Sequence, residues 1–218
     1  MHTLNSQKVV FPLKPNIVVL ANGECPTHQI PLDMLTKAEK IICCDGAISF
    51  LEQINITPHI IIGDCDSVSF AQREKFQSLI KIEENDSYND LQKAIKYCIE
   101  MNWDEITLLG ASGLREDHFL ANIGILMHYA NRILIKLVTN YGFFIPILHT
   151  TTFESYPGQQ VSIFSFSPGS EITYRGLKYS VYRRQFKELW EGSLNEAIAD
   201  NFTVEVENNA ALLVYLTF

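Results

Sequence analysis

Apolar residues follow two patterns along the chain, and the pattern changes near residue 145. From residue 16 to about residue 139, short apolar runs alternate with stretches in which apolar side chains recur every three to four positions. This alternation is typical of a parallel sheet flanked by helices. The predicted strands are residues 16–21, 40–44, 59–62, 78–82, 105–109 and 133–138.

Two stretches have the spacing of a helix with one apolar face. Their apolar residues recur at intervals of three and four, so that they lie along one stripe. These residues are Leu91, Ala94, Ile95, Cys98 and Ile99 in the first helix, and Phe119, Ile123, Leu126, Met127 and Ala130 in the second. The first helix is expected to begin near Asn89.

Beyond Gly142 the chain becomes a series of short segments rich in Thr, Val, Tyr and Phe. They predict strands at residues 143–153, 160–166, 171–174, 203–207 and 211–218, separated by turn signals such as Pro157-Gly158, Pro168-Gly169 and Asn208-Asn209. The series predicts an antiparallel sandwich or barrel-like unit. We therefore expect two domains, residues 1–145 and 146–218, without a long linker.

Composition limits the class of protein. Hydrophobic residues make up 47% of the 218 positions, which excludes a disordered chain, and no apolar run approaches the roughly 20 residues that cross a bilayer. The net charge of -8 argues against a general nucleic-acid-binding face. The first residues lack the pattern of a secretory signal, so we expect a cytoplasmic protein. The five cysteines show no Cys-x-x-Cys spacing, which favours neither a disulfide framework nor a zinc site.

The most informative stretch is an apolar run that ends in Gly63-Asp64-Cys65-Asp66-Ser67. In an extended chain alternate side chains point the same way, so Asp64 and Asp66 are predicted to converge past a buried strand, with Cys65 directed away. Two carboxylates so placed suit a hard cation such as Mg2+, whose other positions phosphates and water fill. The alternative for an isolated pair is a turn whose aspartates cap the next helix.

Other polar residues follow neighbouring strands of the predicted sheet. Asn22-Gly23 follows the first strand, Asp45-Gly46 the second and a Gly-rich loop at residues 110–118 the fifth, while Asp90 stands at the start of a helix. In open parallel sheets, ligands bind beyond the carboxyl ends of the strands. Each residue could by itself belong to a turn or a cap, but four carboxylates on one sheet edge would repel one another without a cation. The set predicts a metal-assisted phosphoryl site.

The loop at residues 110–115 has small residues that let backbone N–H groups approach a phosphate, at the partly positive amino end of a helix. Arg115 adds a planar fork for phosphate oxygens. The loop is neither Gly-x-x-x-x-Gly-Lys-Ser/Thr nor Gly-x-Gly-x-x-Gly, so it favours neither a P-loop enzyme nor a dinucleotide dehydrogenase. Asp117 and His118 point in different directions on a helix, so His118 is expected to be a satisfied or ligand-edge residue.

Together these motifs resemble those of the thiamine pyrophosphokinase family over nearly the whole chain. The Gly63-to-Ser67 motif is similar to the family's Gly-Asp-x-Asp-Ser, Asp45-Gly46-Ala47 to its Asp-Gly-Ala, and residues 89–94 to its Thr-Asp-Leu/Phe-x-Lys-Ala. Residues 110–118 are similar to its Gly-Ala-Thr-Gly-Gly-Arg-x-Asp-His. In the second half, residues 176–179 resemble its Gly-Leu-Lys-aromatic turn and residues 192–196 its Gly-x-Ser-Asn-Glu.

The resemblance implies an α/β fold, with a parallel-sheet, Rossmann-like N-terminal domain that has helices on both faces and an all-β sandwich C-terminal domain. It implies a thiamine diphosphokinase, which transfers pyrophosphate from ATP to the hydroxyl of thiamine and releases AMP. It further implies Mg2+, a homodimer, an active site between the subunits, and thiamine binding by the C-terminal domain.

By motif, the resemblance assigns roles to individual residues. The expected metal ligands are Asp64, Asp66 and Asp90, which form the expected catalytic set together with Arg115 and Asp117. The expected ATP-binding residues are Asn22, Asp45, Gly46, Gly110, Ser112, Gly113 and Arg115. The expected substrate-binding residues are Tyr179, stacked on the pyrimidine, Asn195 and His118. The proton acceptor is left open between Asp45 and Asp66.

Three positions depart from the family's motifs. Leu114 replaces a Gly, which would reshape the loop if that position needs a positive φ. Asn89 replaces a Thr but is still a capping residue, and Leu194 replaces a Ser. These positions surround the substrate more than the metal. The alternatives are a pyrophosphokinase for another heterocyclic alcohol such as a hydroxymethylpterin, a nucleotide-sugar glycosyltransferase, and a noncatalytic module that binds thiamine or a nucleotide.

Overall fold

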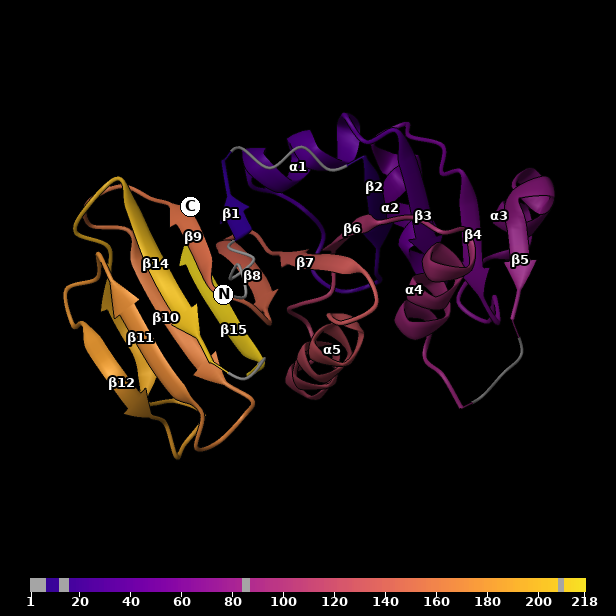
Figure 1. Cartoon of the computed structure of the whole chain (residues 1–218). Helices are drawn as coiled ribbons and strands as arrows, with labels where there is room; N and C mark the ends of the chain where they lie inside the picture. Colours follow the sequence, from indigo (N-terminus) through magenta and orange to yellow (C-terminus); the bar gives the residue numbers. More distant parts are fainter. Residues whose placement is uncertain (1–6, 12–15, 84–86, 208–209) are drawn as a thin grey trace. The chain divides into compact units, whose positions relative to one another are not determined.

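The chain forms two compact units. The computed structural model describes residues 7–11, 16–83, 87–207 and 210–218. The first unit ends at Asn140, and residues 7–11 join residues 141–218 in the second unit (Figure 1). The division expected near residue 145 thus lies within a strand of the second unit, and the first described residues belong to that unit rather than to the first.

The first unit is built on a parallel sheet with the strand order β5-β4-β3-β2-β6-β7. Its strands are β2 (Ile17–Leu20), β3 (Lys40–Cys44), β4 (Ile60–Gly63), β5 (Ile80–Ile82), β6 (Glu105–Leu109) and β7 (Leu134–Val138). The strands predicted in this half of the chain are confirmed, with small shifts at their ends.

Burial explains why these strands read as continuous apolar runs. All of β2 is buried, and β3, β4 and β6 are buried at every residue after the first. A sheet covered on both faces has no solvent side, so apolar residues are needed at successive positions rather than at alternate ones.

Five helices connect these strands within the described residues: α1 (Gln29–Thr36), α2 (Ile48–Gln53), α3 (Phe70–Lys75), α4 (Asp90–Glu100) and α5 (Glu116–Tyr129). The two predicted helices are confirmed as α4 and α5. The other three were missed because six to eight residues are too few to establish a helical period. No helix in the described ranges is long and apolar enough to cross a membrane.

The order of the strands creates a topological switch point. After β2 the chain adds β3, β4 and β5 on one side, and then returns to place β6 and β7 on the other side (Figure 1). Because parallel crossovers are right-handed, α1 to α3 cover one face and α4 and α5 the other, and α4 packs on β2, β3 and β4. Such sheets bind ligands beyond the carboxyl ends of the strands at the switch, here β2 and β6.

The second unit is a β-sandwich of two sheets, with the orders β1-β9-β14-β11-β12 and β13-β10-β15-β8. All pairs within these sheets are antiparallel except β1 on β9. The strands are β1 (Gln7–Val9), β8 (Gly142–Ile147), β9 (Thr151–Glu154), β10 (Gln160–Ser165), β11 (Glu171–Arg175), β12 (Val181–Gln185), β13 (Gly192–Glu196), β14 (Asn201–Val206) and β15 (Leu212–Thr217).

The expected all-β sandwich is confirmed, but one predicted strand is wrong. The stretch at residues 143–153 is two strands, because β8 ends at Ile147 and a turn through Leu148, His149 and Thr150 precedes β9. The sequence also did not predict β1, β12 or β13. Four of the five residues of β12 are exposed, so no apolar alternation marks that strand.

Stacked aromatic rings lie in the core of the second unit. Phe153 of β9 and Phe202 of β14 are opposite one another in the strand register, and both are at most 1% exposed. Their ring centroids are 5.0 Å apart with an angle of 12° between the planes. This offset arrangement fills the core and adds to the burial of both rings.

We expect Phe202→Ala to lower the free energy of unfolding by about 3–5 kcal/mol, because it leaves a cavity against Phe153. Urea unfolding followed by circular dichroism measures the loss. Leu189→Ala, at a partly exposed position of the same unit, is the control and should change the value by less than about 0.5 kcal/mol. Equal effects of the two substitutions would contradict the role of the stacked pair.

Candidate active site

The turn after β4 brings carboxylates together. One oxygen each of Asp45, Asp64 and Asp66 lies within 4.8 Å of the others. The backbone N–H of Asp66 donates to Asp64 Oδ1 at 3.1 Å, and Ser67 Oγ donates to Asp66 Oδ1 at 2.8 Å. The backbone N–H of Ser67 donates to Asp45 Oδ2 at 3.2 Å, which links the turn to the end of β3. The turn is therefore folded around its own carboxylates.

The reason that the sequence suggested for this convergence is wrong. The backbone is not extended through Asp64 and Asp66, since β4 ends at Gly63 and Cys65 has a φ of 64°. This left-handed residue turns the chain and leaves both aspartates exposed, while Cys65 is 2% exposed. The Cys65 side chain thus lies away from the solvent side of the turn, but a turn rather than strand alternation places it there.

Asp45 is the buried member of the cluster. The residue is 3% exposed, and no N–H or O–H donor among the described residues reaches its Oδ1. Burial raises the pKa of Asp45 to about 6; the hydrogen bond from Ser67 opposes the rise, and the nearby Asp66 and Asp90 add to it. A buried carboxylate oxygen without a donor, beside two exposed carboxylates, fits an oxygen-ligand set for a divalent cation.

Asp90 lies beside this cluster at the first position of α4. Asn89 caps the helix, since its Oδ1 accepts the backbone N–H of Gln92 at 2.9 Å, so the expected capping role is confirmed. Burial raises the pKa of Asp90, and Lys93 opposes this rise through an ion pair of 3.2 Å with Oδ1. A Cβ at Gly63 would lie 2.9 Å from Asp45 Cβ and 3.2 Å from the Asp90 carboxyl carbon, so a larger residue there would press on both aspartates.

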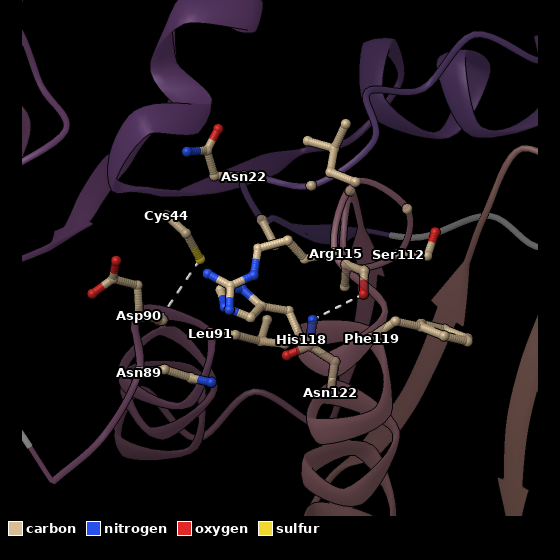
Figure 2. Close-up of a pocket in the computed structure, with 16 residues that line it drawn as sticks. Asn22, Cys44, Asn89, Asp90, Leu91, Ser112, Arg115, His118, Phe119 and Asn122 are labelled. Atoms are coloured by element: carbon tan, nitrogen blue, oxygen red, sulfur yellow. Dashed lines mark hydrogen bonds between the residues drawn. The ribbon is translucent and has the colours of Figure 1, made fainter.

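A pocket of about 320 Å³ lies at the switch point of the sheet. Figure 2 shows the side chains that line it, including Asn22 after β2, Asp90 at the start of α4 and Ser112 after β6. The expected ATP-binding residues Asn22, Gly110, Ser112, Gly113 and Arg115 all line this pocket. Asp45 and Gly46 do not, although a side chain at Gly46 would come within 2.6 Å of Asn22 Nδ2.

The two loops that form the pocket are held against each other by backbone hydrogen bonds. The N–H of Gly23 donates to the carbonyl of Gly110, and the N–H of Glu24 donates to that of Ser112, both at 2.7 Å. A Cβ on Gly23 would lie 2.4 Å from the Gly110 carbonyl oxygen. This glycine is therefore needed for the close approach of the two backbones.

Arg115, at the end of the Gly-rich loop, lines the pocket, whereas its partner Asp117 is not among the lining residues. Arg115 binds Asp117 through two hydrogen bonds, of 3.1 Å from Nε and 2.6 Å from Nη2, and this pair lowers the pKa of Asp117. Both side chains are more than half exposed. His118 is exposed and lines the pocket. Leu114 has a φ of 59°, so this chain has a leucine in the left-handed conformation that favours glycine.

The remaining expected substrate residues lie in the second unit. Tyr179 is exposed, as an aromatic face for a ligand requires. Asn195 is buried, and its amide is used within the unit: Oδ1 accepts the N–H groups of Tyr179 and Glu196, and Nδ2 donates to the Tyr179 carbonyl. Asn195 thus fixes the backbone that carries Tyr179. Leu194, with a φ of 59°, is exposed.

Sequence reasoning missed several residues around the pocket. Phe119 and Asn122 line it from α5, and the Asn122 amide donates to the Ala111 carbonyl at 2.9 Å (Figure 2). Lys93 is buried against Asp90, and its place three residues later on the same helix was a readable signal.

Asn140 was also missed, because its partners are more than a hundred residues away. Its Oδ1 accepts the N–H groups of Thr27 at 2.7 Å and His28 at 3.0 Å, and its Nδ2 donates to the Cys25 carbonyl at 3.0 Å. One side chain therefore fixes the loop that leads from the pocket to α1. No short-range pattern could have indicated these bonds.

These features define a two-domain protein with an acidic cluster beside a pocket on a parallel sheet, joined to a β-sandwich. Residues 32–137 match the model of the thiamin pyrophosphokinase catalytic domain, and residues 142–215 match that of the thiamin pyrophosphokinase substrate-binding domain. The chain belongs to the thiamin pyrophosphokinase family.

Two curated relatives are similar over part of the chain. Thiamin pyrophosphokinase 1 of Caenorhabditis elegans is 29% identical over 131 residues, which are 53% of this chain and 51% of that protein. Thiamine pyrophosphokinase of Bacillus subtilis is 27% identical over 143 residues, which are 62% of this chain and 66% of that protein. The match therefore spans about half the length of the nematode relative.

Solved structures support the fold over nearly the whole chain. The thiamin pyrophosphokinase from Candida albicans has a TM-score of 0.83 at 18% identity and covers 99% of this chain and 93% of its own. The Bacillus subtilis enzyme has a TM-score of 0.78 at 22% identity, with 92% and 97% covered. The fold class that the sequence predicted is confirmed.

The buried Asp45 predicts a pH-dependent stability in the absence of divalent cations. Its pKa, raised to about 6, means that the folded protein binds a proton more tightly than the unfolded chain does. The folded state therefore loses stability as the pH rises from about 4 to about 6, and the loss is complete above that range. We expect Asp45→Asn, which removes the buried charge, to raise the melting temperature at pH 8.

Thermal unfolding in a chelating agent at pH 5, 6, 7 and 8 measures this effect. The gain from Asp45→Asn should shrink as the pH falls below 6. Asp33→Asn, which removes an exposed carboxylate of α1, is the control and should give no gain at pH 8. A gain from Asp45→Asn that is equal at every pH would rule out a raised pKa.

Proposed function

We propose that this protein transfers a pyrophosphoryl group from ATP to the hydroxyl of thiamine, giving thiamine diphosphate and AMP. The observation that carries the proposal is the cluster of Asp45, Asp64 and Asp66 beside a pocket at the switch point of the sheet. Membership of the thiamin pyrophosphokinase family indicates the reaction class. The matched catalytic and substrate-binding domains agree with a reaction of two substrates, ATP and thiamine.

The residues present fit a divalent cation. Asp64 and Asp66 are exposed, Asp90 lies next to them, and Asp45, which belongs to the same cluster, has one oxygen without a donor. We assign Asp64, Asp66 and Asp90 as the ligands of Mg2+. Asp45 is the buried carboxylate beside them and is not assigned as a ligand. The cation would neutralise the ATP phosphates when it is bound.

The pocket residues would bind and align ATP. Asn22 and the backbone of Gly110 and Gly113 lie on opposite loops of the pocket, and Arg115 stands at its edge. Arg115 would exchange its exposed partner Asp117 for phosphate oxygens, since a guanidinium binds either group through the same planar fork. Pyrophosphoryl transfer depends chiefly on this alignment and on neutralised charge.

Asp45 is the better candidate for the proton acceptor. A pKa of about 6 lets its carboxylate be ionised near neutral pH and still accept a proton from the attacking hydroxyl. The alternative, Asp66, has a lowered pKa, because Ser67 donates a hydrogen bond to it, and is therefore a weaker base. We therefore propose Asp45 as the proton acceptor, of the two residues that the sequence left open.

The second unit would bind thiamine through Tyr179, with Asn195 holding the backbone of that residue in place. His118 would contact the substrate from the edge of the pocket.

We also propose a homodimer in which the active site lies between subunits. The second unit exposes several large aromatic and aliphatic side chains, of the kind in which subunit interfaces are enriched. These are Tyr179, Tyr182, Trp190 and Leu194. Light scattering of the purified protein tests the dimer, and cell fractionation tests the cytoplasmic location expected from the sequence.

The decisive experiment incubates the purified protein with ATP, Mg2+ and thiamine, and follows AMP and thiamine diphosphate by chromatography. We expect both products in equal amounts, and neither when a chelating agent removes the cation. AMP formation with a hydroxymethylpterin but not with thiamine would replace the acceptor and keep the reaction class. Binding of both ligands without AMP would leave a noncatalytic module.

Asp64→Asn is expected to lower the rate of AMP formation by at least a hundredfold, because the substitution removes a charged ligand of the cation. The melting temperature of the chelated protein should change little, since Asp64 is exposed. Asp33→Asn, an exposed carboxylate on α1, is the matched control and should retain the full rate. Normal turnover of Asp64→Asn would remove the metal-binding role assigned to this residue.

A further inference from the structure

We propose that Arg73 is a positioning residue for the acidic turn, and that it holds residues 64–68 in the conformation that gathers the carboxylates. The inference rests on the cation-binding role proposed for this turn. Arg73 lies on α3 and is not itself a candidate ligand of the cation. Its effect on the cation would therefore be indirect, through the turn whose backbone it binds.

The contacts of Arg73 are directed at the backbone of the turn. Its Nη2 donates to the carbonyl of Cys65, and its Nε donates to the carbonyl of Val68 at 3.0 Å. Both bonds are partly buried. A guanidinium is planar and rigid, so two bonds from one group fix the separation of the two carbonyls. Cys65 and Val68 are the two buried residues of the turn.

The turn needs such support because its conformation is unfavourable in two ways. Cys65 has a φ of 64°, which a residue with a Cβ seldom adopts. The turn also holds Asp64 and Asp66 close to Asp45, and these like charges repel one another. Arg73 places a positive charge on the backbone side of the turn, so that the carboxylate oxygens stay available to a cation.

The helix that carries Arg73 is itself bound to α2, the helix that follows Asp45. A capping box of Ser69 and Gln72 starts α3. Gln72 Nε2 and Lys75 Nζ bind the two carboxylate oxygens of Glu52 on α2, at 2.7 Å and 2.8 Å. The turn that contains Asp45 leads directly into α2. The same frame therefore holds both the acidic turn and the buried aspartate.

The test compares Arg73→Met and Arg73→Lys with Glu74→Gln, which alters an exposed residue of the same helix without touching the acidic turn. Hydrogen exchange of the full chain in a chelating agent is the first measurement. The N–H groups of Asp66 and Ser67 bind Asp64 and Asp45, so their protection reports directly on the turn. We expect Arg73→Met to speed exchange of these amides at least tenfold, Arg73→Lys to have a smaller effect, and Glu74→Gln to have none.

The second measurement is titration with Mn2+, followed by electron paramagnetic resonance, with and without a non-hydrolysable ATP analogue. Loss of a residue that orients ligands typically weakens metal binding by about 10–100-fold. We expect such a loss in Arg73→Met, a smaller one in Arg73→Lys, and a change of less than twofold in Glu74→Gln. If Arg73→Met does not fold, Arg73→Lys is judged by the same criteria.

Wild-type Mn2+ affinity together with wild-type exchange in the Arg73 variants would overturn the proposal. Faster exchange with unchanged Mn2+ affinity would also overturn it, because the turn would then not position the ligands. If the wild-type protein binds no Mn2+ at all, the proposed cation role of the turn fails, and this inference falls with it. Faster exchange would in that case still assign Arg73 a structural role.

Discussion

The repulsion between carboxylates at one edge of the parallel sheet is the constraint on which the rest of the site depends. Asp45, Asp64 and Asp66 are held close together by backbone bonds, by the short helices α2 and α3, and by a residue in a left-handed conformation. The backbone bonds and the left-handed residue are not needed to build the sheet, although α2 and α3 also connect its strands. The local structure therefore holds like charges together, which agrees with the cation site that we propose for this turn.

In both units, a rigid backbone frame holds the residues that are candidates for ligand binding. In the first unit, the pocket is formed by loops whose backbones touch, and glycine is required where they approach. In the second unit, a buried amide on Asn195 fixes the backbone of an exposed aromatic residue. Leu114 and Leu194 stand outside this framing, since both are exposed with a positive φ. They are the positions at which this chain differs most from the family's motifs.

The sequence predicted strands and helices where a strong apolar period or a complete motif existed. Continuous apolar runs predicted the buried strands, and the i, i+3, i+4 spacing predicted α4 and α5. The left-handed Cys65 was not predictable, because nothing in Asp-Cys-Asp distinguishes a turn from an extended strand. Arg73 and Asn140 were missed because their partners are backbone groups brought near by tertiary folding, and a backbone group carries no residue-specific signal. The short α1 to α3 were missed because one or two turns do not establish a period.

The order of the strands also sets a schedule for folding during synthesis. The segment β1 pairs with β9, whose residues are made only after the whole first unit has emerged. The central strand β2 likewise lacks one of its two neighbours until β6 has been synthesised. The first unit is thus an insertion within the second. During synthesis it folds while β1 is still unpaired, because β9 has not yet been made. Contacts of such large sequence separation slow folding, so the nascent chain exposes apolar strand edges for longer than a protein with local pairing would.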